Sequence, residues 1–226
     1  MEPNRVIFIE GVPELQGYTH RAIFDRNEAA SWAAAALATK GDIFVGGVEP
    51  EEMMTFLNVF RKVGGASDVQ DDGIRFWHPG GTLNPVTIET DVHPGFMTDW
   101  QQPLVVALTQ AEGLSTIHET VYENRFGFTD ALNKMGANIV VYKDGLAHED
   151  RRVKRREFEQ AAVITGPTPL HGADIEVPDL RGGFSHLIAA LTAEGQSRVS
   201  NLGIISRGYE NFIEKLGLLG PDFVFE

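Results

Sequence analysis

The chain has 226 residues, 42% of them hydrophobic, so it can bury the core of one domain or at most two small ones. Asp and Glu outnumber Lys and Arg by 32 to 19, and the formal net charge of −13 argues against nucleic acid or an anionic membrane as a partner. The sequence has no Cys, which excludes disulfide bonds, thiolate metal sites and a Cys nucleophile within it.

The first part of the chain alternates strands and helices. We expect strands over 5–10 and 20–24, a helix that starts just after Asp25 and ends at Gly41, a strand over 43–45 and a second helix from Pro50 to Gly64. Pro is favoured at the start of a helix and Gly just past its end, so these boundaries are well marked.

The same order of elements returns twice further along the chain. The second copy has a strand over 86–89, a helix from about 99, a strand over 115–119, a helix ending at 135 and a strand over 138–142. The third copy has a strand over 174–177, a helix over 182–193, a strand over 197–201, a helix over 209–219 and a strand over 222–225. The segment 143–160 between them is charged and irregular, and we interpret it as an exposed insertion.

This repetition predicts the fold. Asp25, Asp99 and Asp179 open the three copies and lie 74 and 80 residues apart. One supersecondary unit used three times has to bury its apolar face against the other copies. We therefore expect a single α/β domain over 1–226 with pseudo-threefold symmetry. Its units lie at about 5–78, 85–142 and 161–226, with the insertion at about 143–160.

Charged residues gather at the predicted helix starts. These starts carry Asp25 with Arg26, Thr98 with Asp99, and Asp179 with Arg181. One interpretation is that each Asp caps its helix by accepting backbone N–H bonds. The arginines favour a second interpretation, because the helix dipole disfavours positive charge at this end. Helix N-termini together with guanidinium groups form a binding site for phosphate or carboxylate.

The sequence gives no signal for a metal, a cofactor or a membrane segment. The seven His residues show no spacing typical of a metal site, and no dinucleotide fingerprint surrounds the glycine pairs. No apolar run reaches the roughly 18 residues of a membrane helix, and the N-terminus lacks a basic and then apolar signal. We therefore expect a cytoplasmic protein that uses neither metal nor cofactor and binds no membrane.

Four motifs resemble one family of enzymes. They read HPGFMTDWQQP over 93–103, ETVYENRF over 119–126, PDLRGG over 178–183 and SRGYENFIEKLGLLG over 206–220. In this order they resemble the UDP-N-acetylglucosamine 1-carboxyvinyltransferases of the enolpyruvyl transferase (EPSP synthase-like) family. The resemblance implies an inside-out α/β barrel domain of three repeat units. It also implies transfer of enolpyruvyl from phosphoenolpyruvate to the 3-hydroxyl of UDP-N-acetylglucosamine, a step in the synthesis of peptidoglycan precursors.

The resemblance covers only half of the family's architecture. Family members have two three-unit domains with the substrates in the cleft between them, and the other domain supplies a Lys, nucleotide contacts and a Cys or Asp general acid. The chain thus resembles a C-terminal half, and we expect it to be inactive unless a separate N-terminal-half chain completes it. The alternatives are a catalytically inactive nucleotide-sugar binding or regulatory module and a truncated fragment.

The resemblance also implies roles for single residues. Asp99 matches the carboxylate that contacts the acceptor hydroxyl and removes its proton, which helps because a sugar hydroxyl is a poor nucleophile. Arg181 and Arg207 match arginines that bind phosphoenolpyruvate, since a guanidinium can hold a carboxylate or phosphate with two bonds. The other implied substrate-binding residues are Thr98, Arg26 at the domain interface, and Val121, Tyr122 and Glu123 at the nucleotide sugar.

Overall fold

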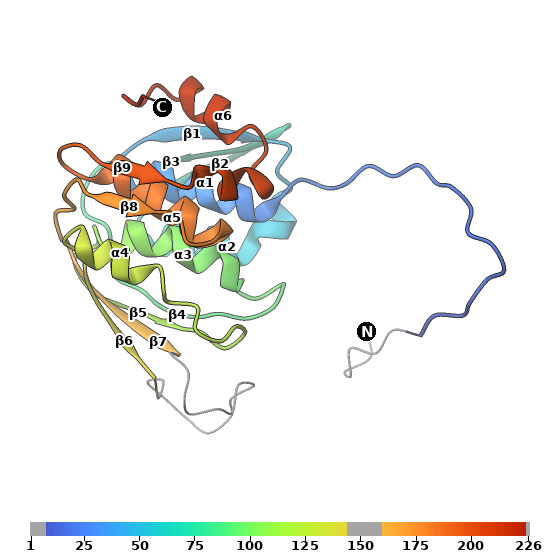
Figure 1. Ribbon diagram of the computed structural model, residues 1–226, viewed down its shortest axis with the longest axis horizontal. Helices are drawn as coiled ribbons and strands as arrows, with labels where there is room; N and C mark the ends of the chain where they lie inside the picture. The colour runs from blue at the N-terminus through green and yellow to red at the C-terminus, as the bar shows by residue number, and fades with distance from the viewer. Residues whose placement is uncertain (1–7, 144–159, 225–226) are drawn as a thin grey trace.

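The computed structural model describes residues 8–143 and 160–224 (Figure 1). All but the end residues of the predicted insertion 143–160, and the first residues of the strand expected over 5–10, lie outside these ranges. The described body consists of helices covered by three small sheets, and residues 8–24 form an arm that leads away from it. The α/β class predicted from the sequence is confirmed.

Three buried helices form the centre of the body. α1 (Arg26–Ala38), α3 (Thr98–Leu108) and α5 (Leu180–Thr192) pack against one another. α1 is rich in alanine, and Ala30, Ala33 and Ala34 are completely buried. A helix that is apolar on all sides belongs in a protein interior. Its methyl groups are small, so the neighbouring helices can pack close to its backbone.

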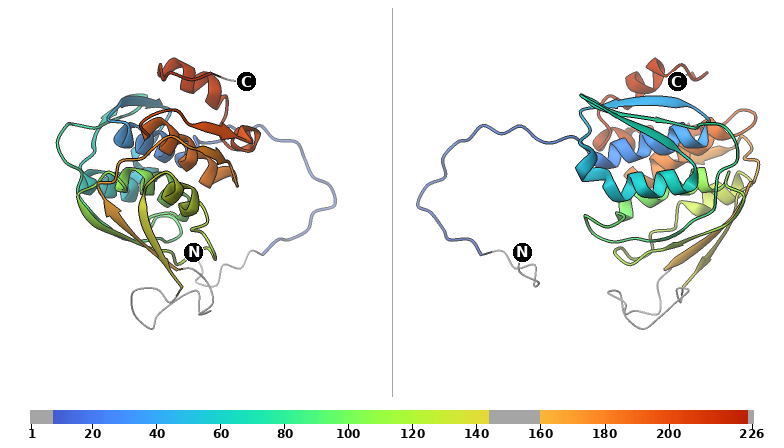
Figure 2. Two further views of the ribbon diagram at one scale, coloured as in Figure 1. Left: turned by 60° about the vertical axis from the view of Figure 1, so that its left-hand side comes forward. Right: turned by 180° about the vertical axis from the view of Figure 1, so that it is seen from behind.

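The three sheets lie on the outside of these helices (Figure 2). The first sheet is antiparallel and has the order β1 (Asp42–Gly46), β3 (Gly73–Trp77), β2 (Ala66–Gln70). The second has the order β4 (Thr87–Glu89), β5 (Gly113–His118), β7 (Ala161–Gly166), β6 (Asn138–Tyr142). The third pairs β8 (Asp174–Glu176) with β9 (Arg198–Ser200).

Shorter helices connect these elements. They are η1 (Pro50–Met53), α2 (Met54–Val63), α4 (Thr129–Lys134), η2 (Leu202–Arg207) and α6 (Phe212–Leu218). The predicted end of the second helix is confirmed, because Gly64 follows α2 with a left-handed φ of 110°. None of the helices in the described ranges combines the length and the apolar character that crossing a bilayer requires.

Two of the sheets each contain a pair of parallel strands that a central helix connects. β4 and β5 flank α3 in the sequence and pair in parallel, with Ile88 opposite Ile117. β8 and β9 flank α5 in the same way, with Ile175 opposite Val199. A helix that connects two parallel strands packs on one face of their sheet. The connection from β8 to α5 is short, whereas residues 90–97 lie between β4 and α3.

Three predicted strands are absent from the described residues. The sequence predicts strands over 5–10 and 20–24, yet residues 8–24 contain no strand, and Phe8 and Ile9 are 85% and 86% exposed. Residues 222–224, the described part of the last predicted strand, are also irregular. A strand exists only through hydrogen bonds to a neighbouring strand. The described residues offer no paired neighbour at either place, so an apolar β-prone sequence alone does not form one.

β7 belongs to the second sheet, although it follows the insertion in the sequence. It pairs antiparallel with β5, where Ser115 lies opposite Ile164, and with β6, where Val140 lies opposite Val163. No strand is predicted here from the sequence, and the third unit is expected to start at 161. The pairing instead groups residues 161–166 with the second sheet, because sheet membership depends on contacts that are distant in the sequence.

Candidate functional site

The first turns of the three central helices meet in a network of charged side chains. Arg181 on α5 lies between two carboxylates, with Nη2 3.8 Å from Asp25 Oδ2 and Nε 3.6 Å from Asp99 Oδ2. Arg125 donates through Nη2 to the other oxygen of Asp99. Asn27 Nδ2 lies 3.4 Å from Asp99 Oδ2. Asp99 is therefore held by donors from α1, from α5 and from the segment after β5.

The three aspartates are not equivalent. Asp25 accepts the backbone N–H groups of Asn27 and Glu28 at 2.8 and 3.3 Å, so it caps α1. Asp179 caps α5 by accepting two backbone N–H groups, both at 2.9 Å. α3 already begins at Thr98, and Asp99 sits in its first turn with only side-chain partners. The capping interpretation is confirmed for Asp25 and Asp179 and is wrong for Asp99.

Arg181 rests on a buried aromatic pair. Its Cζ lies 5.3 Å from the centre of the Tyr209 ring, which stacks on Phe184 with a centroid distance of 4.3 Å. The Tyr209 hydroxyl lies 2.8 Å from Ser31 Oγ. Burial raises the pKa of Tyr209, so the phenol stays neutral at ordinary pH. This platform fixes the guanidinium of Arg181 in place.

The site carries positive charge with unused donor atoms. Although burial opposes it, contact with Tyr209, Asp25 and Asp99 raises the pKa of Arg181, so the guanidinium stays charged. Within the described residues, Arg181 Nη1, Arg125 Nε and Asn27 Oδ1 are buried and have no hydrogen-bond partner. Buried polar atoms normally have a partner, so these three are available to a ligand. A carboxylate or phosphate would suit the two arginine nitrogens.

A buried glutamate, Glu119, connects the start of α3 to the turn that follows β5. Glu119, 2% exposed, follows β5 and accepts four hydrogen bonds. The donors are Thr98 Oγ1 at 2.7 Å, Gln101 Nε2, the Val121 N–H at 2.7 Å and the Tyr122 N–H at 2.8 Å. The N–H groups of Val121 and Tyr122 are therefore occupied. The Arg125 guanidinium lies over the exposed Tyr122 ring, at 4.8 Å.

Three of the expected binding residues lie apart from the network. Arg26 Nη1 pairs with Glu52 Oε2 at 2.5 Å, and His93 Nε2 lies 3.6 Å from the same oxygen. Arg207 is exposed at the end of η2 and forms no ion pair with the described acidic side chains. Glu123 is exposed in the turn after Tyr122. The structure brings together Asp99, Arg181 and Thr98, and it places Val121 and Tyr122 beside them.

Four polar residues of the site are not predicted from the sequence. Arg125, Glu119 and Gln101 lie inside the motifs ETVYENRF and HPGFMTDWQQP, so the signal was present but these letters were assigned no role. Asn27 had no signal beyond its place after Arg26. The described residues contain no group of three or more His, Asp or Glu side chains arranged to hold a metal ion.

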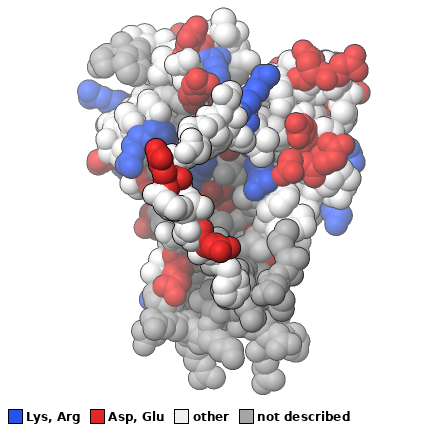
Figure 3. Space-filling view, turned by 90° about the vertical axis from the view of Figure 1, so that its right-hand side faces the viewer, with Lys and Arg blue, Asp and Glu red and all other residues white. Residues whose placement is uncertain are grey.

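The charges on the site's side of the molecule are mixed. Figure 3 shows this side, where α1 begins, and there Lys and Arg side chains lie among Asp and Glu side chains. The network itself contains two aspartates and two arginines. A small anion can be bound here only through specific guanidinium groups, since the net charge of −13 repels it at long range.

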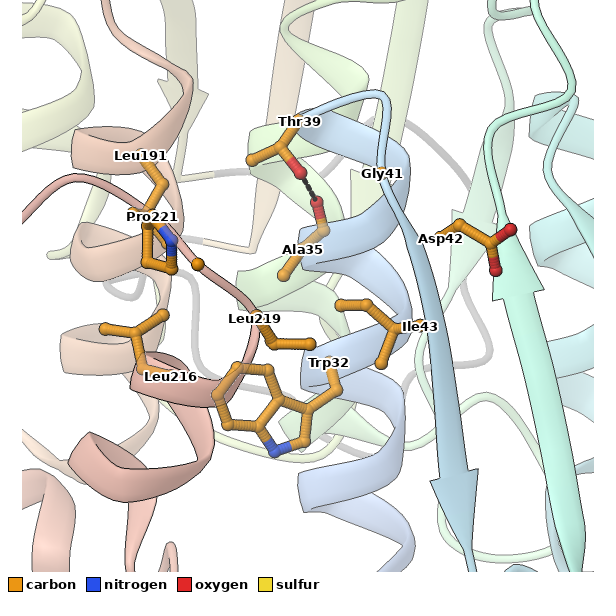
Figure 4. A pocket seen from close by; sticks show the side chains of 11 residues that line it. Trp32, Ala35, Thr39, Gly41, Asp42, Ile43, Leu191, Leu216, Leu219 and Pro221 are labelled. Carbon is orange, nitrogen blue, oxygen red and sulfur yellow. Dashed lines mark hydrogen bonds between the residues drawn. The ribbon is translucent and has the colours of Figure 1, made fainter.

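A cavity of about 260 Å³ lies elsewhere (Figure 4). It is lined mainly by apolar side chains from α1, β1, the end of α5 and the region of α6, including Trp32, Ile43, Leu191, Leu216, Leu219 and Pro221. Thr39 and Gly41, just after the end of α1, also line it, whereas the charge network lies at the start of that helix. The cavity is therefore not part of the site.

Comparison with known proteins gives the class of the chain. Residues 2–216 match the model of the EPSP synthase (3-phosphoshikimate 1-carboxyvinyltransferase) family, and the chain belongs to this family. The enolpyruvyl transferase NikO from Streptomyces tendae has a similar structure, with a TM-score of 0.71 and 26% identity over 87% of this chain and 43% of that one. EPSP synthase from Acinetobacter baumannii, 16% identical, shares the fold with a TM-score of 0.62 over 88% of this chain and 46% of that one.

Particular relatives share much more sequence. A UDP-N-acetylglucosamine 1-carboxyvinyltransferase from Protochlamydia amoebophila is 50% identical over 98% of this chain and 48% of its own length. The protein of the same name from Chlamydia abortus is 44% identical over 96% of this chain and 49% of its own. The chain spans about half the length of the curated relatives it matches. The family resemblance stated from the four motifs is confirmed.

Proposed function

We propose that the chain is the half of a UDP-N-acetylglucosamine 1-carboxyvinyltransferase that carries the acceptor-activating carboxylate. The complete enzyme would transfer enolpyruvyl from phosphoenolpyruvate to the 3-hydroxyl of UDP-N-acetylglucosamine. The observation that carries this proposal is Asp99, which caps nothing and is held only by side chains that a substrate could displace. It lies in a chain 50% identical to an enzyme of that name.

The proposal also includes the arrangement of the repeat units. We regard 1–226 as one inside-out barrel domain with three units, in which helices lie inside and sheets outside. Two observations support it: α1, α3 and α5 pack on one another, and a parallel strand pair surrounds both α3 and α5. The sheet of the first unit then lacks the strand that precedes α1.

Each site residue has a proposed task. Asp99 accepts the proton of the sugar hydroxyl as its oxygen attacks, and thereby acts as general base. Arg181 and Arg125 hold the negative charge of phosphoenolpyruvate through Nη1 and Nε, which have no described partner. The other proposed binding residues are Thr98, Val121, Tyr122 and Glu123 near the nucleotide sugar, and Arg26 and Arg207 toward the cleft. The substrates imply a cytoplasmic enzyme without metal or cofactor.

The partner in this proposal is a second chain equivalent to the N-terminal half. The test mixes the purified chain with the N-terminal half of the Protochlamydia amoebophila relative, and measures phosphate release from phosphoenolpyruvate with UDP-N-acetylglucosamine. We expect release that needs both halves and both substrates. Binding of the nucleotide sugar without any turnover would instead favour a binding or regulatory module. Neither binding nor turnover would count against the proposal and favour a truncated fragment.

A further inference from the structure

The carboxylate of Glu119 has an unusual set of partners. It is 2% exposed, and the four donors that surround it are neutral. A buried charge is tolerated only when hydrogen bonds replace the water it has lost. Glu119 therefore depends on all four donors, and the segments that carry the donors are held at fixed positions around it.

The donors divide between two segments of the site. Oε2 accepts from Thr98 and Gln101, which stand on either side of Asp99 in the first turns of α3. Oε1 accepts from the backbone of Val121 and Tyr122. The same turn leads to Arg125, whose guanidinium returns to Asp99. Glu119 and the Asp99–Arg125 pair thus join α3 to the 121–125 turn at two places.

We propose that Glu119 is a positioning residue for this site, an inference that rests on the proposed function. It fixes the 121–125 turn against the start of α3. It thereby sets how Arg125 meets Asp99, and it directs the carbonyl oxygens of the turn toward the nucleotide sugar. Small displacements of positioned groups cost enzymes large factors in rate, so a carboxylate that touches no substrate can still control the reaction.

The first test uses the chain alone and measures hydrogen exchange of its backbone amides. Glu119→Gln replaces one acceptor oxygen with an NH₂ group that faces existing donors. We expect residues 120–126 to exchange about 10-fold faster or more, because the turn loses its anchor. The matched control is Asn133→Ala, which removes two hydrogen bonds to the Ile139 backbone, at 2.8 and 2.9 Å. The control should leave exchange at 120–126 unchanged.

The second test measures kinetics after the chain is combined with an N-terminal half. We expect Glu119→Gln to raise the KM for UDP-N-acetylglucosamine by about 10-fold or more and to lower kcat, because the contacts and the base are both misplaced. Asn133→Ala should have the kinetics of the unaltered chain even if it lowers the melting temperature. If Glu119→Gln fails to fold, Gln101→Leu replaces it, since it removes a single donor to Glu119, and KM and kcat are expected to change about 3-fold.

The outcomes separate this inference from the proposed function. If the unaltered pair of halves shows no turnover, the proposed function fails, and the exchange measurement still decides the role of Glu119. Wild-type exchange at 120–126 in the variant overturns the inference. So do unchanged KM and kcat in an active pair, because Glu119 would then only stabilise the fold.

Discussion

Among single residues, the three aspartates at the starts of the central helices differ in their hydrogen-bond and ion-pair partners. Asp25 and Asp179 each use Oδ1 to accept two backbone N–H groups of the helix they cap, whereas Asp25 Oδ2 faces Arg181. Asp99 uses its oxygens on Arg125, Arg181 and Asn27. Asp99 has no backbone partner and side chains can rotate away, so we propose that Asp99 exchanges these partners for the substrate hydroxyl.

The first prediction concerns Asp99→Asn in the reconstituted enzyme. The amide keeps the shape and one acceptor oxygen but cannot take up a proton, so turnover should fall about 100-fold or more. The free energy of unfolding should change by only about 1 kcal/mol, because the ion pairs are partly exposed. A kinetic assay and a thermal melt measure the two effects. Asp130→Asn, an exposed change in the first turn of α4, should leave both unchanged. A normal rate for Asp99→Asn would remove it from the mechanism.

The second prediction concerns pH and Tyr209. Burial raises the pKa of Tyr209 above the value of about 10 that it has in the unfolded chain. The unfolded chain therefore releases this proton first, and stability should fall as pH rises above about 10. Tyr209→Phe loses the bond to Ser31, which should cost about 1 kcal/mol at neutral pH, but it lacks this titration. Urea unfolding at pH 8 to 11 measures the free energy of unfolding of the unaltered chain and of Tyr209→Phe, and the difference between the two should become smaller above about pH 10. A constant difference would contradict the prediction.

At the scale of elements, the close packing of α1 sets the geometry of the helix layer. Ala33 and Ala34 are completely buried. The start of α5 shows the same tight fit, because a Cβ on Gly183 would lie 2.3 Å from Val177 Cγ1. These contacts leave no room for a larger side chain, so the separation of the helices follows from the small size of Ala and Gly.

The third prediction is that Ala33→Leu destabilises the chain by about 1–3 kcal/mol, because the core cannot expand without moving a helix. Urea unfolding should show a lower midpoint with an unchanged slope. The control is Lys62→Leu on the exposed side of α2, which should change stability by less than about 0.5 kcal/mol. Equal effects of the two substitutions would mean that α1 is not tightly packed.

Elements defined by local signals could be predicted from the sequence, and elements defined by distant partners could not. The helix of 26–38 and the glycine that ends α2 follow from periodicity and from the backbone freedom of Gly64. The strand expected over 20–24 was wrong because strand formation needs a neighbour. The pairing of β7 with β5 and β6, which precede the insertion, has no signal in the local sequence. For the site, Asp99 and Arg181 came from motifs, whereas the role of Arg125 depends on a contact 26 residues away.

For the whole molecule, the proposed function requires a second domain that covers the charge network. The chain covers 48% of its Protochlamydia amoebophila relative, and the charge network contains buried donor atoms that have no partner among the described residues. The arm over 8–24 carries exposed apolar side chains such as Phe8, Leu15 and Tyr18. Under the proposed function, the chain alone offers its substrates only part of the contacts that the complete enzyme would make.

The fourth prediction is that the chain alone releases no detectable phosphate from phosphoenolpyruvate and UDP-N-acetylglucosamine. The general acid and the second wall of the cleft are expected on the other half, and losing such groups costs several orders of magnitude in rate. A phosphate assay on the purified chain, with Asp99→Asn as the background control, checks this. Release above that background would show that one half suffices.

The alanine content of α1 has an evolutionary consequence. The helix that holds Asp25 and Asn27 can stand this close to those that hold Asp99 and Arg181 only because its side chains end at Cβ. Selection for activity should therefore act on residues that never touch a substrate. The test is a library of α1 variants, expressed together with an N-terminal half in cells whose growth depends on the reconstituted enzyme. Leu, Ile and Phe should disappear from positions 30, 33 and 34, and Gly or Ser should survive more often than any larger residue.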